Sequence, residues 1–178
     1  LAHLVTYGIS LGIAPAQAAW LLSVMSVGSA IGRVGLGWLS DRIGRLACLI
    51  GASAFEVVLL LALAYLPQPA VLYAIAALTG LVFGTWLTLY GPTATDLFGL
   101  RYGGAIYGAL YLSYGLGGLL GPTLGGLLAD RTGSYRAAFL VSAFFCAVAA
   151  ALYYAVLRTH HVEFVHRPAL DEEFPEAA

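Results

Sequence analysis

Charge is what this sequence lacks most. Only 10% of its 178 residues are Asp, Glu, Lys or Arg, against about 25% in an average soluble domain. Lysine is absent, so arginine supplies every permanent positive charge. With 61% hydrophobic residues, the chain has too few polar groups to cover a water-facing surface, which favours a helical membrane protein embedded in a lipid bilayer. A formal net charge of −1 gives no indication of a nucleic-acid partner.

Cysteine is almost as scarce, and motifs for catalysis are missing. Cys48 and Cys146 each lie within an apolar run, whereas a disulfide or metal framework needs more cysteines in exposed loops. We interpret both as small core residues. The sequence contains no nucleophile–base constellation, phosphate-binding loop or metal motif, so we predict neither an enzyme nor a bound cofactor or metal. The chain begins at Leu1 without a basic segment or cleavage site, so no signal peptide is predicted, and we expect a fragment whose upstream part is missing.

Long apolar runs are what the sequence has in abundance. A membrane-spanning helix needs about 20 predominantly apolar residues. Five runs reach this length, namely residues 18–39, 46–66, 70–90, 104–128 and 137–157. Because these runs are continuous rather than alternating, they predict helices and not strands. Residues 1–7 are too short to span, and we expect them to be the end of a sixth helix that is truncated at its start.

The connecting segments and their arginines predict the orientation in the membrane. The expected connectors are residues 8–17, 40–45, 67–69, 91–103 and 130–136. One side of the membrane would hold five arginines and the other two: Arg42, Arg45, Arg101, Arg158 and Arg167 against Arg131 and Arg136. The excess predicts that the 40–45 loop, the 91–103 loop and the C-terminus are cytoplasmic. We therefore divide the chain into a helical bundle, residues 1–158, and a polar cytoplasmic tail, residues 159–178, of a multi-pass protein in the plasma (inner) membrane.

A charged pattern occurs twice in the chain. Residues 37–44 and 126–133 both read G-x-L-[SA]-D-R-x-G, and the two copies would lie on opposite sides of the membrane. Inverted repeats are common in transporters, but shared chemistry at helix ends, a small residue followed by charge at the interface, would give the same pattern. Both explanations remain open.

The first copy, extended to residue 45, resembles the G-x-L-x-D-R-x-G-R loop of the major facilitator superfamily, which recurs in both halves of these twelve-helix transporters. The wider sequence resembles one branch, the monocarboxylate porters and their oxalate–formate antiporter relatives. The stretches that carry this resemblance are residues 3–13, Gly32-Arg33, Pro92, 96–99, 121–126, 130, 132–133 and 135. The resemblance implies that the chain is the C-terminal half, with five complete helices after a truncated one, and that a six-helix N-terminal half is its missing partner.

Arg33 is the central candidate for substrate binding. It lies eight residues before Asp41, so about 12 Å from the interface along a helix and close to the midplane of a core about 30 Å thick. An arginine at that depth costs several kcal/mol unless it meets water, a partner or a substrate. Its guanidinium fork could hold a carboxylate. The alternatives are a side chain that reaches back toward the cytoplasm, or one paired with an acid of the missing half. The resemblance favours the carboxylate.

Two departures from the family pattern bear on coupling and substrate. Many animal monocarboxylate porters have an aspartate for proton coupling four residues before the arginine, where this chain has Ser29, which cannot carry a proton. Oxalate transporters of the family add a lysine on helix eleven, whereas residues 104–128 contain no cationic residue. One arginine balances one carboxylate, so the sequence favours a monoanion over a dianion.

Aromatic residues with helical spacing could line a cavity. Each set, one on residues 70–90 and one on residues 104–128, shares a helix face. The candidates are Trp86, Tyr90, Tyr111 and Tyr114, with Tyr107 less favoured and with His3 and Tyr7 on the first segment. The alternative is ordinary packing or anchoring at the membrane interface.

A second group of residues could control the conformational change. Asp41, with Arg42 and Arg45, could clasp the start of a neighbouring helix near Gly103 through the helix dipole, or could only fix topology. The small ridge Gly117–Gly121–Gly125 with Pro122 could act as a hinge (Gly121 and Pro122) or serve packing alone. Glu56 is the one acid in the middle of an apolar run, and it is either a proton-coupling site or a neutral, hydrogen-bonded acid.

Together these observations predict secondary active transport of a small monocarboxylate anion such as lactate, pyruvate or formate-like acids. The mechanism would be alternating access with Arg33 on the carboxylate, by proton symport or anion exchange. Two alternatives stay open: a facilitator for another metabolite or drug with a structural Arg33, and a non-transporting membrane fragment that acts as an assembly partner.

Overall fold

The computed structural model describes residues 3–159, apart from the side chain of Tyr102. It consists of α1 (Leu4–Ser10), α2 (Pro15–Ile43), α3 (Arg45–Tyr65), α4 (Pro69–Phe98), α5 (Leu100–Thr132) and α6 (Arg136–Thr159). Five of these helices, α2 to α6, are long and apolar enough to cross a membrane, which confirms the predicted all-α membrane fold. The polar tail predicted for residues 159–178 lies, from residue 160 onward, outside the described residues.

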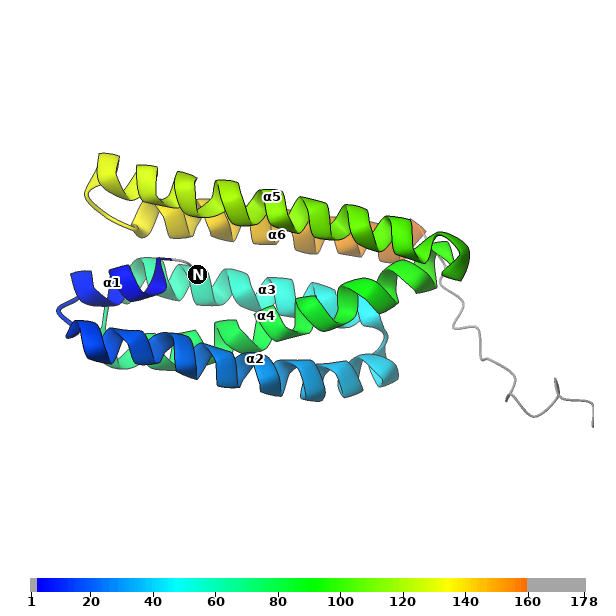
Figure 1. Cartoon of the computed structure of the whole chain (residues 1–178), viewed down its shortest axis with the longest axis horizontal. Helices are drawn as coiled ribbons and strands as arrows, with labels where there is room; N and C mark the ends of the chain where they lie inside the picture. The colour runs from blue at the N-terminus through cyan, green and yellow to red at the C-terminus, as the bar shows by residue number, and fades with distance from the viewer. Residues whose placement is uncertain (1–2, 160–178) are drawn as a thin grey trace, which may run out of the picture.

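The long helices run along one axis, and successive helices reverse direction (Figure 1). The α2–α3 turn, the α4–α5 turn and the end of α6 therefore share one end of the bundle, here called the Arg45 end. In Figure 1 α5 and α6 lie together above α1 to α4. The main buried cluster joins residues of α1 to α4 with Ala143 of α6, so the core lies in the lower layer and against α6.

Two of the predicted connectors are wrong, because single glycines make the turns. Gly44 (φ 94°) separates α2 from α3, and Gly99 (φ 77°) separates α4 from α5. Glycine adopts these left-handed conformations without a steric penalty, so no longer loop is needed. The expected loops 40–45 and 91–103 are consequently almost entirely helical, and α4 continues through Pro92. A proline there removes one backbone hydrogen bond, a loss that transmembrane helices tolerate.

The closest helix contact is between α2 and α4, and it is built from glycine. Gly28 and Gly32 on α2 face Gly80 and Gly84 on α4. A Cβ atom added to any of the four would come within 2.0–2.1 Å of a backbone carbonyl oxygen of the other helix. The two backbones therefore touch directly, as in other small-xxx-small contacts of membrane helices. This contact fixes how α2 presents its next residue, Arg33.

The ridge predicted on α5 does not form a comparable contact within residues 3–159. A Cβ atom at Gly117 or Gly121 would meet no atom within 4 Å, whereas Gly125 lies against the ring of His3. The α5 surface also exposes large apolar side chains, including Leu112 and Leu119, each 68% exposed. Most of this ridge is therefore uncovered in the part of the chain that the structure describes.

Candidate functional site

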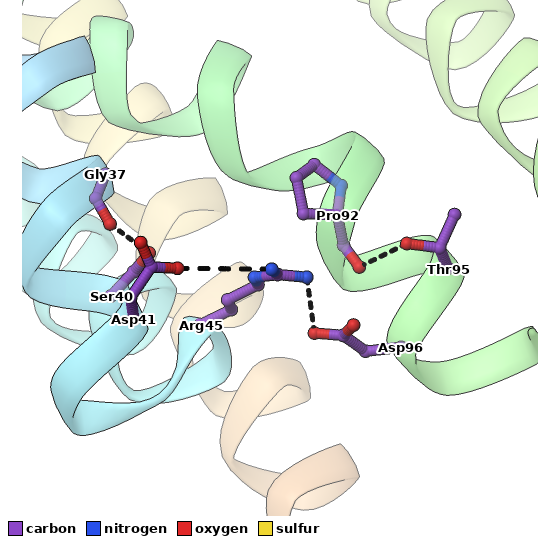
Figure 2. A network of polar contacts seen from close by, with 7 residues as sticks. All are labelled: Gly37, Ser40, Asp41, Arg45, Pro92, Thr95 and Asp96. Atoms are coloured by element: carbon purple, nitrogen blue, oxygen red, sulfur yellow. Dashed lines mark hydrogen bonds and ion pairs between the residues drawn. The ribbon is translucent and has the colours of Figure 1, made fainter. Parts of the chain in front are cut away.

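Arg45 joins three helices at one end of the bundle. As the first residue of α3, it donates a hydrogen bond from Nη1 to Oδ2 of Asp96 on α4 over 2.6 Å. Its Nη2 lies 4.0 Å from Oδ1 of Asp41 on α2. Figure 2 shows the three side chains in one network. Because the Asp41 and Asp96 side chains are 71% and 47% exposed, solvent screens these pairs, and an exposed ion pair contributes about 0.2–1 kcal/mol.

The local backbone explains why Asp96 reaches Arg45. Because α4 does not end at Pro92, Asp96 occupies the turn that follows it. The hydroxyl of Thr95 donates to the Pro92 carbonyl over 2.8 Å, and the amide of Gly99 closes the helix on the Thr95 carbonyl over 2.9 Å. Both contacts keep the last turn of α4 helical up to the glycine, and Figure 2 shows the first of them.

The structure brings together only part of the predicted charged gate. Asp41 faces Arg45 and not the start of α5 near Gly103, because the α2–α3 turn is only one residue long. Arg42 lies apart from the network, with its guanidinium carbon 3.8 Å above the ring centre of Trp38. The sequence did not identify Asp96 as the main partner of Arg45. The acid is 51 positions away from Arg45, and only its place in a matched family motif drew attention to it.

Arg33 projects from the middle of α2, and its side chain is exposed. Its neighbour Gly32 is locked against the Leu81 carbonyl of α4, which fixes the position of the Arg33 backbone. Among residues 3–159, no carboxylate forms an ion pair with it. Arg33 thus lies ten residues before the end of α2, on a rigid support, and its exposed side chain can meet a group from outside this part of the chain.

The aromatic candidates divide into two sets. Tyr107, Tyr111 and Tyr114 form a ladder on α5, with ring centres 4.5 Å and 6.1 Å apart along it. Each is exposed by 38–46%, so the ladder is open. Trp86 instead packs against both buried clusters, and Tyr90 packs against the second of them together with Tyr153 of α6. The helical spacing in the sequence did not show that the two sets face different surroundings.

His3 and Tyr7 both point into the bundle, and both are already hydrogen-bonded. Nε2 of His3 donates to the carbonyl of Pro122 over 2.7 Å, which joins α1 to the proline of α5. The hydroxyl of Tyr7 donates to the Leu63 carbonyl over 2.9 Å. The ring of Tyr135 packs between them, with centre distances of 5.6 Å and 5.7 Å. Their role in substrate binding stays a prediction, and in this structure they hold α1 in place.

A cavity of about 700 Å³ opens at the end of the bundle opposite Arg45. Its lining includes Tyr7, Tyr65, Asp130 and Arg136, and the guanidinium of Arg136 lies 4.4 Å from the ring centre of Tyr65. Of the predicted substrate residues, only Tyr7 belongs to this cavity.

A single buried acid completes the set of candidates. Glu56 is 4% exposed and is the only charged residue among the buried side chains of residues 3–159. It lies in the middle of α3, beside Thr79 of α4 and Cys146 of α6.

Five long apolar helices, with an arginine at mid-depth and an ion pair that links the helix ends, define a multi-pass membrane protein of the transporter class. The chain belongs to the Major Facilitator Superfamily, whose family model matches residues 2–176. This match confirms the resemblance seen in the charged loop.

Curated relatives narrow the similarity to one branch. Monocarboxylate transporter 12 of Rattus norvegicus is 32% identical over 146 residues, which are 80% of this chain and 30% of that protein. Monocarboxylate transporter 13 of Bos taurus is 35% identical over 148 residues (80% and 34%). Monocarboxylate transporter 11 of Mus musculus is 33% identical over 156 residues (80% and 34%). The chain thus spans about a third of the length of the curated relatives it matches.

Proposed function

We propose that this chain forms the C-terminal six-helix half of a secondary transporter for small monocarboxylate anions, which works by alternating access. The observation that carries the proposal is Arg33, at mid-depth on α2 and without an acid partner in residues 3–159. A permanent cation at that depth needs water, an anion or a substrate beside it. A transported carboxylate meets this need, and it leaves when the site opens to the other side.

The chemistry of a guanidinium–carboxylate contact at Arg33 supports an anion with one carboxylate. A guanidinium offers two parallel donors that match the two oxygens of a carboxylate. No second cationic residue occurs in residues 104–128, so a second carboxylate would remain unbalanced. Lactate, pyruvate and formate-like acids fit this limit, and the names of the relatives point to the same substrate class.

The aromatic residues would shape the cavity around the anion. Tyr111 and Tyr114 are partly exposed on α5, so their hydroxyls can reach a substrate or the water around it. Trp86 and Tyr90 are packed behind them against the core, where they would support the cavity wall. His3 and Tyr7 would place α1 at its edge.

The charged network would act as the gate. Arg45 with Asp96 and Asp41 ties the ends of α2, α3 and α4 in this conformation, and the Gly121–Pro122 segment of α5 is a point where a helix can bend. The arginine excess supports an orientation in which the Arg45 end lies on the cytoplasmic side of the plasma (inner) membrane.

The direct test measures uptake of labelled lactate by proteoliposomes that contain the full-length protein, with Arg33→Ala and Arg33→Lys. Each charge-assisted hydrogen bond that is lost costs about 1.5–3 kcal/mol. We therefore expect at least a tenfold loss of uptake for both variants. Arg158→Ala is the matched control, because Arg158 lies at the exposed end of α6 and contacts Tyr154. Normal uptake by both Arg33 variants would refute the proposal and favour a structural arginine.

A further inference from the structure

The interior between α3, α4 and α6 contains buried polar atoms without partners. Glu56 is 4% exposed, Thr79 2% and Ser53 0%. Oγ of Ser53 has no hydrogen-bond partner among the described residues, and Oε2 of Glu56 and Oγ1 of Thr79 form no bond of good geometry, although the Thr79 hydroxyl lies close enough to interact with the Glu56 carboxyl. Buried polar groups are normally satisfied, and a buried ionised carboxylate is very costly unless it is paired. Among the described residues the Glu56 carboxyl therefore has Thr79 as its polar neighbour and no cation, a setting that favours its neutral, protonated form.

Two of these groups, Glu56 and Thr79, lie side by side across α3 and α4. Ser53 and Glu56 are three residues apart on α3 and share a face, and Thr79 on α4 lies beside the carboxyl group. From α6, Cys146 is the titratable group next to Glu56. On the α1 side, the Tyr7 hydroxyl donates its hydrogen bond to the Leu63 carbonyl. No arginine within residues 3–159 forms an ion pair with Glu56.

Glu56 and Arg33 lie at a similar depth on opposite sides of α4. Glu56 is eleven residues from Arg45 and Arg33 eight residues from Asp41, so the two lie about 16 Å and about 12 Å from the same end of the bundle. On one side α4 packs its Leu81 carbonyl against Gly32, and on the other it turns Thr79, two residues earlier, toward Glu56. α4 thus lies between Glu56 and Gly32, the residue before Arg33.

Ser29, four residues before Arg33 on α2, has no ionisable side chain. Ser29 is 8% exposed, and its carbonyl oxygen lies 2.1 Å from the place where a Cβ of Gly84 would be. That residue is thus part of the α2–α4 contact. Glu56 is the remaining acid at mid-depth in the described chain.

We propose that Glu56 is the group that binds and releases a proton co-transported with the anion. This inference rests on the proposed function. In the empty carrier the Glu56 carboxylate balances the charge of Arg33. When the anion occupies Arg33, the carboxylate accepts one proton from hydronium and becomes a neutral acid, and water is the other product. The interior carries no net charge in either state, so one anion crosses with one proton.

The test uses the full-length protein in proteoliposomes with Glu56→Gln, which keeps the shape of the side chain and removes its charge. We expect lactate accumulation driven by a pH gradient to fall more than tenfold. Exchange of internal for external lactate, which needs no net proton movement, should stay within about twofold of the wild type. Retained exchange also shows that the variant is folded. Accumulation at the wild-type level would overturn the proposal.

A second measurement separates this inference from the proposed function. Infrared spectra of the purified wild type and of Glu56→Gln, recorded without substrate, isolate the Glu56 carboxyl. Because the empty carrier holds Glu56 as a carboxylate, we expect a protonated-carboxyl band that appears in the wild type as the pH falls, at a pH where exposed carboxyls are still ionised, and that is missing from Glu56→Gln. If the wild type transports no lactate but shows this titrating band, the substrate class is wrong and the proton site stands. If the band is absent, or does not change with pH, the proton site is refuted.

Discussion

The α2–α4 contact can be tested with a single methyl group at Gly32. The added Cβ would lie 2.1 Å from the Leu81 carbonyl oxygen. Real Cβ atoms stay beyond about 3.0 Å from such an atom, so the two backbones must separate by roughly 0.9 Å or more. Overfilling a close-packed contact typically costs about 1–3 kcal/mol. We therefore expect Gly32→Ala to lower the free energy of unfolding by that amount.

Gly35 supplies the matched control on the same helix. A Cβ there would meet no atom within 4 Å, and replacing glycine by alanine in a helix interior gains up to about 1 kcal/mol. Gly35→Ala should therefore leave stability unchanged or raise it. The measurement is thermal or denaturant unfolding of the purified full-length protein in detergent, followed by helix content.

Transport adds a second measurement for the same pair of variants. Since Gly32 precedes Arg33, moving α2 outward also displaces the guanidinium, and lactate uptake should fall with Gly32→Ala but not with Gly35→Ala. If the two variants unfold at the same temperature and transport equally well, the backbone contact described here is not present in the protein.

The other predictions concern the gate and the first helix. Arg45→Asp and Asp96→Arg should each lower the free energy of unfolding by up to about 1 kcal/mol. In a double-mutant cycle the double variant should recover most of this loss. Arg42→Asp is the control, and Asp96→Arg should not rescue it. Independent effects of the two substitutions would show that the pair does not interact. Tyr7→Phe removes the hydrogen bond to the Leu63 carbonyl and should cost about 0.5–1.5 kcal/mol without changing the KM for lactate; a raised KM would place its hydroxyl on the substrate.

The hydrophobic runs predicted the membrane-spanning helices well, because a spanning segment must be apolar along its whole length. Their ends were less predictable. Charge and proline around 40–45 and 91–103 suggested loops, but one left-handed glycine suffices for each reversal, and a helix with a water-exposed end can carry Asp41 and Asp96.

Lateral packing was harder to predict than helix position. The pairs Gly28–Gly32 and Gly80–Gly84 have the small-xxx-small spacing, so the sequence did contain a signal for close helix contact. The same spacing on α5, however, meets no partner at Gly117 or Gly121. Spacing shows that a helix can be approached closely, and it does not show by which helix.

The same limit applied to the candidate site. Arg33 and Glu56 stood out because a charge in an apolar run is costly wherever it points. Trp86 and Tyr90 were also candidates, but their surroundings could not be predicted, because an aromatic residue is compatible with a cavity, a core or a membrane surface. Only the fold turned them toward α6 and the buried clusters.

The glycine contact also sets the mechanics of the bundle. At four levels a carbonyl of one helix lies in the space that a side chain would fill on the other, so neither helix can slide or rotate without a collision. α2 and α4 should therefore move together as one rigid body. A displacement of α2 at Arg33 would then also move Asp96 near the end of α4 and Thr79 beside Glu56. The substrate arginine, the charged gate and the proton site would therefore be mechanically coupled through this helix pair.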